Sequence, residues 1–93
     1  MSHFIEKLAA LIADRNANPK EGSYTNRLLA EPTKAAQKVG EEATEVIIAA
    51  LAQSDERLVE EMADLLYHSL VLLETRGVRW AEVVAELEKR HGQ

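Results

Sequence analysis

The sequence predicts an all-α protein, a helical hairpin-based bundle of about four helices whose core is completed by homodimerisation. Apolar residues recur at three- and four-residue spacing along most of the chain, which is typical of amphipathic helices. Clusters of Asn, Pro, Gly and Ser near residues 16–22, 53–54 and 77 interrupt this spacing and indicate turns. With 93 residues the chain suits a single domain, 1–93, near the lower limit of size for burying its own core.

The first helix is expected over residues 3–16, after which the chain becomes irregular. Ser2 suits its N-cap, and the face expected to be buried consists of Phe4, Leu8, Leu11 and Ile12. From Asn18 to Pro32 we expect an irregular connection, because Asn, Pro and Gly break the helical spacing. Pro32 then suits the first position of the second helix, where a missing backbone N–H costs no helical hydrogen bond.

The second and third helices should form the hairpin. We expect the second over about 32–52 and the third over about 55–76, with Ser54 as an N-cap and Gly77 as a left-handed stop. The stripes that should face each other are Val39, Ala43, Val46, Ile47 and Ala50 on the second helix and Leu58, Met62, Leu65, Leu66 and Leu73 on the third.

The third helix is apolar around much of its circumference, more than a small monomer can cover. We therefore expect a homodimer in which third helices help to build a shared core. A fourth helix is expected over about 79–91, and its inward residues should be Trp80, Val83, Val84 and Leu87.

Two acidic pairs occupy matching positions on this hairpin. Glu42 and Glu45 precede the turn, Glu61 and Asp64 follow it, and each three-residue spacing places both side chains on one helix face. In an antiparallel hairpin both pairs lie roughly 12 Å from the turn, at the edges of the apolar stripes. Two carboxylates about 4 Å apart repel by on the order of 4 kcal/mol at an effective dielectric constant near 20. A hard divalent cation, Mg²⁺ or alternatively Mn²⁺, offsets that repulsion, although a solvated face is the ordinary alternative for any single carboxylate.

Five neighbours of these pairs could support the site or belong to the ordinary helix surface. A rotation of about 100° around the helix separates Glu41 and Glu60 from the pairs, so each would lie either behind the metal-binding carboxylates or in solvent. His68 lies four residues after Asp64, where it could chelate a metal, hydrogen-bond behind the ligands or simply occupy the core. Lys38 and Lys34 precede Glu42 by one and two turns, so they could contact phosphate or form ion pairs within the helix.

Charge and hydropathy exclude several classes of partner. A net charge of −5, with Lys and Arg spread along the chain, argues against a nucleic-acid surface. No apolar run approaches the roughly 18 residues of a membrane span, and the first fifteen residues carry charges unlike a signal peptide. We therefore expect a cytoplasmic protein that acts on a small molecule and contacts neither nucleic acid nor membrane.

Three strings resemble a known family: SYT at 23–25, KVGEEATE at 38–45 and ADLLYH at 63–68. In this order and spacing they are similar to phosphoribosyl-ATP pyrophosphohydrolases, within the all-α nucleotide pyrophosphohydrolase superfamily that includes MazG-like proteins. The resemblance implies a dimeric helical enzyme of the second step of L-histidine biosynthesis. Its activity would be Mg²⁺-dependent hydrolysis of phosphoribosyl-ATP to phosphoribosyl-AMP and pyrophosphate.

The resemblance also implies roles for individual residues. The catalytic, metal-binding carboxylates would be Glu42, Glu45, Glu61 and Asp64. The residues lining the nucleotide pocket would be Ser23, Tyr24 and Thr25, although a segment that only caps or packs on the bundle is the ordinary alternative. Arg27, nearby, is a weaker candidate for a phosphate contact.

Three alternatives remain open at this point. A house-cleaning pyrophosphohydrolase acting on NTPs or dNTPs would use the same carboxylates and a different pocket. A di-iron bundle requires Glu-x-x-His pairs, which these pairs are not. A helical dimerisation module without activity would use its acidic edges for solubility alone.

Overall fold

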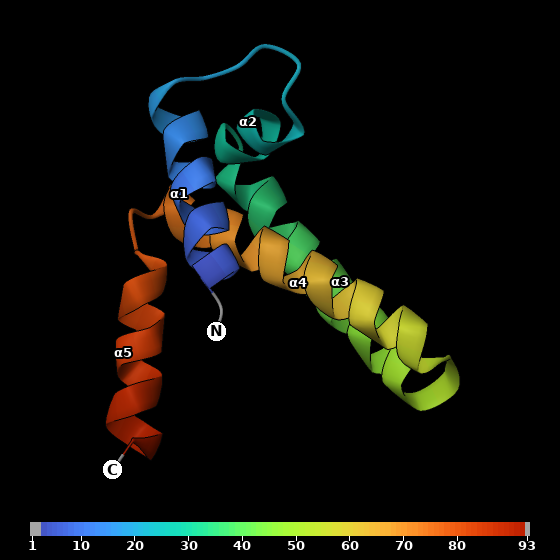
Figure 1. Ribbon diagram of the computed structural model, residues 1–93. Coiled ribbons are helices and arrows are strands. Elements are labelled where there is room, and N and C mark those ends of the chain that lie inside the picture. The colour runs from blue at the N-terminus through green and yellow to red at the C-terminus, as the bar shows by residue number, and fades with distance from the viewer. Residues whose placement is uncertain (1–2, 93) are drawn as a thin grey trace.

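The computed structural model describes residues 3–92, which contain five helices and no strand (Figure 1). The predicted all-α class is therefore confirmed for this range. The helices are α1 (His3–Ala17), α2 (Tyr24–Leu29), α3 (Pro32–Ala52), α4 (Asp55–Thr75) and α5 (Trp80–His91). None of them is long and apolar enough to cross a membrane. The predicted N-cap of the first helix, Ser2, lies outside the described residues.

Helices α3 and α4 form the predicted hairpin, running antiparallel side by side (Figure 1). Pro32 is the first residue of α3, where it needs no hydrogen-bond partner. Ser54 caps α4, because its Oγ accepts a hydrogen bond of 3.2 Å from the backbone N–H of Arg57. Gly77 adopts a φ of 69° beyond the end of α4, the left-handed conformation expected of a stop. The sequence thus predicted both ends of the hairpin correctly.

The connection expected to be irregular contains the short helix α2, so this part of the prediction was wrong. Ser23 Oγ accepts a hydrogen bond of 3.1 Å from the N–H of Asn26 and caps the helix. Leu28 is 1% exposed, and this anchors α2 to the core. Six residues are too few to establish a helical period, so only capping and burial reveal the element. The main core consists of Ile12, Leu28, Ala35, Leu70 and Val71.

The hairpin is rotated relative to the stripes that the sequence predicted. Ala49 and Glu61 are buried, and Glu42 is half-buried on the same face of α3 as Ala49, two turns away. By contrast Ile47, Ala50 and Met62 are exposed, so their predicted place between the helices was wrong. Because α3 carries apolar residues on opposite faces, hydropathy alone did not determine which face meets α4.

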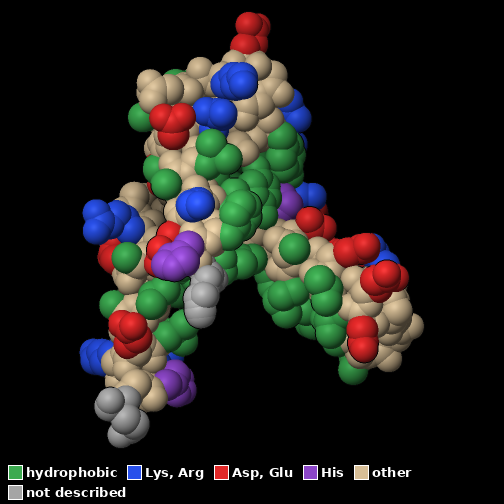
Figure 2. All heavy atoms as spheres, viewed as in Figure 1, with side chains coloured by type: hydrophobic (Ala, Val, Ile, Leu, Met, Phe, Trp, Pro, Cys, Tyr) green, Lys and Arg blue, Asp and Glu red, His purple; other side chains and the backbone are tan. Residues whose placement is uncertain are grey.

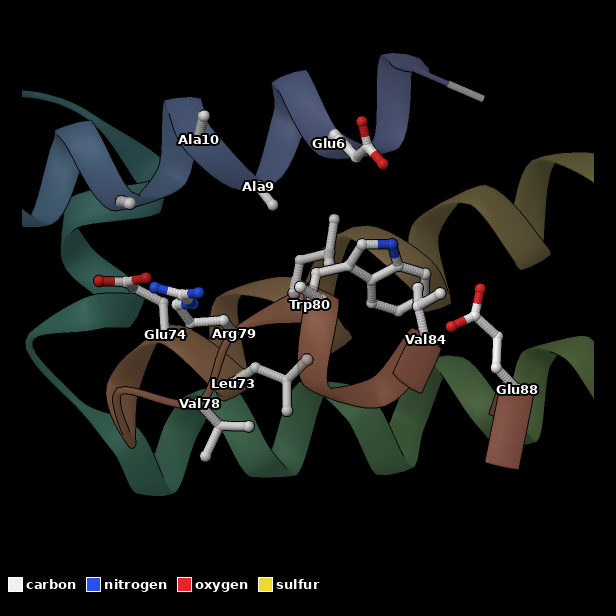
Figure 3. A pocket seen from close by; sticks show the side chains of 13 residues that line it. Glu6, Ala9, Ala10, Leu73, Glu74, Val78, Arg79, Trp80, Val84 and Glu88 are labelled. Atoms are coloured by element: carbon white, nitrogen blue, oxygen red, sulfur yellow. The ribbon is translucent and has the colours of Figure 1, made fainter. Parts of the chain in front are cut away.

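Helix α5 extends away from the hairpin and contacts the rest of the chain near its first turn (Figure 1). Trp80 packs against the core as predicted, and it lies beneath α1 beside Ala9 (Figure 3). It lines a groove of about 510 Å³ between α1, α5 and the end of α4. Val83 and Val84 are half-buried, whereas Leu87 is about half exposed. The prediction that Leu87 points inward was therefore wrong within the single chain.

Helix α1 buries only half of its predicted face. Ile12 is in the core and Leu8 packs against it, as expected. Phe4 and Leu11 are largely exposed, contrary to expectation. Since α1 is covered by α2 and α4 on one side only, its apolar stripe is wider than the surface available within one chain.

Candidate metal centre

Three acidic side chains converge between α3 and α4. Glu42 from α3 and Glu61 and Asp64 from α4 each offer an oxygen atom, and these atoms lie within 4.8 Å of one another. Their environments differ, since Glu61 is 7% exposed, Glu42 is half-buried and Asp64 is exposed. The group therefore opens to solvent on the side of Asp64. Glu45, the fourth predicted ligand, is exposed and lies outside this group.

On the α4 side, Arg57 provides a positive charge beside the carboxylates. Its guanidinium donates to the carboxylates of both Glu60 and Glu61, one turn further along the helix. The hydrogen bond with Glu60 and the attraction of Glu61 raise the pKa of the guanidinium. Glu60 is exposed, so Glu61 is the member of this pair that faces the site.

On the α3 side, Lys38 provides a positive charge beside the carboxylates. Its Nζ lies 3.6 Å from Glu41 Oε1 and 3.7 Å from Glu42 Oε2. Partial burial lowers the pKa of the ammonium, but Tyr24, Glu41 and Glu42 outweigh this effect and raise it above its ordinary value. Two cations thus offset part of the repulsion among the three carboxylates.

The donor set suits a hard divalent cation. Mg²⁺ prefers oxygen ligands at about 2.0–2.1 Å, so two of its ligand oxygens are at most about 4.2 Å apart. The observed limit of 4.8 Å exceeds this by little, and small side-chain rotations would close the difference. Three carboxylates and no free imidazole fit Mg²⁺ or Mn²⁺ better than zinc.

His68 lies behind the carboxylates with both ring nitrogens engaged. Nδ1 is 2.8 Å from the backbone carbonyl oxygen of Asp64, and Nε2 is 3.0 Å from the hydroxyl of Tyr24. The ring packs edge-on against Tyr24 and Tyr67, at centroid distances of 5.9 and 5.0 Å. Of the roles that the sequence left open, the structure favours a hydrogen-bonded residue behind the ligands over a metal ligand.

Comparison with known proteins identifies the family of this chain. The family model described as phosphoribosyl-ATP pyrophosphohydrolase matches residues 5–91, nearly the whole chain. The chain belongs to the phosphoribosyl-ATP pyrophosphohydrolase family. It is 56% identical over 85 residues to a phosphoribosyl-ATP pyrophosphatase of Erythrobacter litoralis, covering 90% of this chain and 81% of that one. The corresponding protein of Sulfurisphaera tokodaii is 48% identical over 90 residues, covering 96% of each chain.

A longer relative is similar over the same region. The histidine biosynthesis bifunctional protein HisIE of Oceanobacillus iheyensis is 47% identical over 88 residues, which are 94% of this chain and 41% of that protein. Membership of the phosphoribosyl-ATP pyrophosphohydrolase family makes this chain a hydrolase of a histidine-biosynthetic family. The alternative of a dimerisation module without activity is thereby set aside.

The segment carrying the SYT string lies against α4 of this pyrophosphohydrolase, where its side chains contact Tyr67 and His68. Ser23 caps α2, Tyr24 contacts His68, and Thr25 Oγ1 is hydrogen-bonded to the hydroxyl of Tyr67. The guanidinium of Arg27 lies 5.5 Å from the centroid of the Tyr24 ring. Lys34, at the start of α3, is exposed.

Two residues of the centre were missed from sequence. Arg57 precedes Glu61 by four residues, a spacing that predicts an ion pair and could have revealed it. Tyr67 adjoins His68 in the ADLLYH string, but only the tertiary contact with α2 distinguishes it from a core aromatic residue.

Proposed function

We propose that the chain hydrolyses phosphoribosyl-ATP to phosphoribosyl-AMP and pyrophosphate, using Mg²⁺, or alternatively Mn²⁺, held by Glu42, Glu61 and Asp64. The observation that carries the proposal is the convergence of these three carboxylates in a chain of this family. Glu45 remains a predicted fourth ligand, one turn further along α3 and exposed.

When bound there, the cation would supply the positive charge that offsets charge developing on the leaving pyrophosphate. Glu42, Glu61 and Asp64 would hold it, and Glu61 shields one side of the site from solvent because it is buried. Lys38, whose Nζ lies 3.7 Å from Glu42 Oε2, would bind a phosphate oxygen. A carboxylate not fully engaged in binding can position the attacking water and accept its proton. The exposed Asp64 and Glu45 are the carboxylates that water reaches most easily.

Release of pyrophosphate from phosphoribosyl-ATP, with and without Mg²⁺, tests the proposal directly. We expect turnover that requires the cation and stops when EDTA is added. A panel of ordinary and damaged NTPs and dNTPs should be poorer substrates. Preference for any of these nucleotides would instead support the house-cleaning alternative, and turnover in EDTA would contradict the metal site.

Glu42 and Glu61 each have a matched control next to them in the sequence. Glu42 and Glu41 share Lys38 as their ion-pair partner. Glu42→Gln should remove most activity and metal-induced stabilisation, whereas Glu41→Gln should leave most of both. Because both residues pair with Lys38, loss of the ion pair alone cannot account for a difference between these two variants. Near-normal turnover in Glu42→Gln would contradict the assignment.

The same comparison is available on α4. Glu61 and Glu60 share Arg57, but only Glu61 belongs to the carboxylate group. We expect Glu61→Gln to lose most activity and Glu60→Gln to lose little. Equal losses would indicate that these residues act through Arg57 and not through a metal ion.

A homodimer is part of the proposal. On the face of α3 opposite α4, Ile47, Ile48 and Leu51 are 58, 42 and 83% exposed, and Val59 and Met62 on α4 are also exposed. Figure 2 shows hydrophobic side chains along the lower edge of the hairpin. Contiguous apolar patches of this kind are rare on monomers and usually mark interfaces. A second copy of the chain would cover them.

Light scattering coupled to gel filtration tests the dimer. We expect twice the mass of the chain for the native protein and a monomer for Leu51→Asp. Thr33→Asp adds the same charge near the other end of α3 and should remain a dimer. A native monomer at micromolar concentration would contradict the proposal.

Cytoplasmic location belongs to the same proposal, because a nucleotide with many phosphate charges does not enter a bilayer.

A further inference from the structure

Helix α5 has little to hold it in place within one chain. None of its 12 residues is buried, and it contacts the rest of the chain near its first turn (Figure 1). A helix of this length is marginal in water unless a packed surface supports it. Val83 and Val84 are only half-buried, and Leu87 is about half exposed. The apolar side of α5 therefore needs a cover from outside the chain.

The groove of about 510 Å³ beside α5 has a lining that suits an apolar helix. Trp80 and Val84 of α5 face Ala9 of α1 across it (Figure 3). Two further alanines, Ala13 of α1 and Ala81 of α5, also line the groove and are exposed. Small side chains on both walls allow another helix to approach closely, while the aromatic ring offers apolar surface to bury.

The chain also exposes more surface than a compact monomer of its size. Its accessible surface is 6685 Å², about 1,300 Å² more than the roughly 5,400 Å² expected for a folded monomer of 10.4 kDa. Its radius of gyration is 14.3 Å, compared with about 12 Å for a compact domain of 93 residues. If each of two subunits buried this excess, the interface would total about 2,600 Å², within the range of permanent dimers.

The apolar run at residues 46–52 is a surface that matches the groove. Its sequence, VIIAALA, contains no polar side chain, and its large residues Ile47, Ile48 and Leu51 are exposed on the side of α3 opposite α4. The hairpin and α5 diverge as two arms, so the run cannot enter the groove of its own chain (Figure 1). Figure 2 shows open space between the arms, with hydrophobic side chains along the edges that face it.

We propose that the homodimer forms by reciprocal docking, in which the apolar run of each subunit lies in the groove between α1 and α5 of the other. The inference rests on the proposed homodimer and names the surface that covers the apolar run. In a two-fold dimer every contact occurs twice, so one arrangement covers both runs and both grooves. Docking also supports α5 and the end of the hairpin, which a single chain leaves exposed.

Cysteine cross-linking tests the docking, because the chain contains no cysteine of its own. One cysteine replaces Ala50 in the apolar run, and a second replaces either Ala13 or Ala81 in the groove. A disulfide requires the two Cα atoms to come within about 7 Å. On oxidation with diamide, we expect Ala50→Cys combined with Ala13→Cys or with Ala81→Cys to give a covalent dimer and no larger species.

Three controls accompany the cross-linking. Ala50→Cys combined with Ala17→Cys should remain uncross-linked, since Ala17 is exposed at the end of α1 outside the groove. Cross-linking of Ala50→Cys alone would show that two apolar runs pack on each other. A ladder of larger oligomers would show an open head-to-tail contact. Either result, or no covalent dimer from both groove variants, would overturn the inference.

A charge placed in the groove gives a second, independent measurement. Ala13→Asp should raise the dimer Kd at least about thirtyfold, the effect of losing a hot-spot residue. Ala17→Asp adds the same charge one turn further along α1, outside the groove, and should change Kd by less than about threefold. Sedimentation over a range of concentrations measures Kd, and circular dichroism checks that helicity is kept. Equal Kd values for the two variants would overturn the inference.

None of these measurements depends on turnover. Absence of phosphoribosyl-ATP hydrolysis in a protein that cross-links as expected would overturn the proposed substrate and leave the docking in place. A native dimer that fails to cross-link would overturn the docking and leave the substrate in place. A native monomer would overturn the homodimer and the docking together. The failures are therefore distinguishable.

Discussion

Neutralising Asp64 should strengthen the metal-free protein and weaken its response to Mg²⁺. Glu42 has Lys38 and Glu61 has Arg57 as partner, whereas Asp64 has no ion pair within residues 3–92. Asp64→Asn therefore removes repulsion without breaking an ion pair. At the outer limit of 4.8 Å, a carboxylate pair repels by about 0.9 kcal/mol at the dielectric constant of water and by about 3.5 kcal/mol at an effective value of 20.

The lower figure applies to each pair, because the Asp64 side chain is exposed. Asp64→Asn removes two such repulsions, about 1.8 kcal/mol together, but it also removes the attraction of Asp64 to the two nearby cations, which offsets part of this gain. We expect the free energy of unfolding in EDTA to rise by at most about 1 kcal/mol, which corresponds to a Tm increase of up to about 4–8 °C in a domain of this size. Mg²⁺ at 100 times its Kd stabilises the native protein by about 2.7 kcal/mol. A tenfold weaker site at that concentration would gain only about 1.4 kcal/mol.

Thermal melts at fixed protein concentration, in EDTA and across a Mg²⁺ titration, measure both effects. Glu21→Gln is the control, since it removes one negative charge from an exposed turn away from the site. It should leave the Mg²⁺ response unchanged. A lower Tm of Asp64→Asn in EDTA, or a Mg²⁺ response equal to that of the native protein, would refute the view that three carboxylates repel one another around a cation site.

Three further predictions concern single residues. Glu45→Gln should weaken Mg²⁺ binding less than Glu42→Gln in calorimetric titrations, because Glu45 lies outside the carboxylate group; equal losses would show that it turns inward on binding. Leu28→Ala should cost about 2–5 kcal/mol in urea unfolding, since Leu28 fills the core between α2 and its neighbours; a loss below about 1 kcal/mol would contradict its role as an anchor. Ser54→Ala should lower the free energy of unfolding by about 1 kcal/mol through loss of the α4 cap, and an unchanged urea midpoint would be inconsistent with the bond to Arg57.

The hairpin could be predicted from sequence because its signals are local. Pro32, Ser54 and Gly77 each fix a helix end through their own backbone or side-chain chemistry, and the structure places all three as expected. The acidic pairs could be matched because they are equally distant from one turn. Three of the four carboxylates do converge, and only Glu45 stays outside the group.

Rotation of the hairpin could not be predicted in the same way. Ile47 and Met62 looked like residues between the helices because hydropathy does not distinguish a face that meets α4 from one that meets another surface. The structure buries Glu61 in that position instead. Helix α2 was missed for a related reason. Six residues show no clear helical period, and the contacts that hold the helix against α4 join residues far apart in the sequence.

Burial of Glu61 beside the half-buried Glu42 has consequences for the stability of the hairpin. Apolar residues at such positions would usually be as stabilising as a buried ion pair, or more so. Most of the buried apolar side chains lie towards one end of the hairpin, where α1 and α2 pack against Ala35, Leu70 and Val71. The stretch from the carboxylates to the turn has little of this support, and its outer face exposes large apolar side chains. A cation between the helices would offset the charge of the carboxylates, and a second subunit outside them would cover the exposed apolar side chains. The residues that weaken the isolated hairpin are therefore the ones that a metal-dependent dimeric enzyme requires.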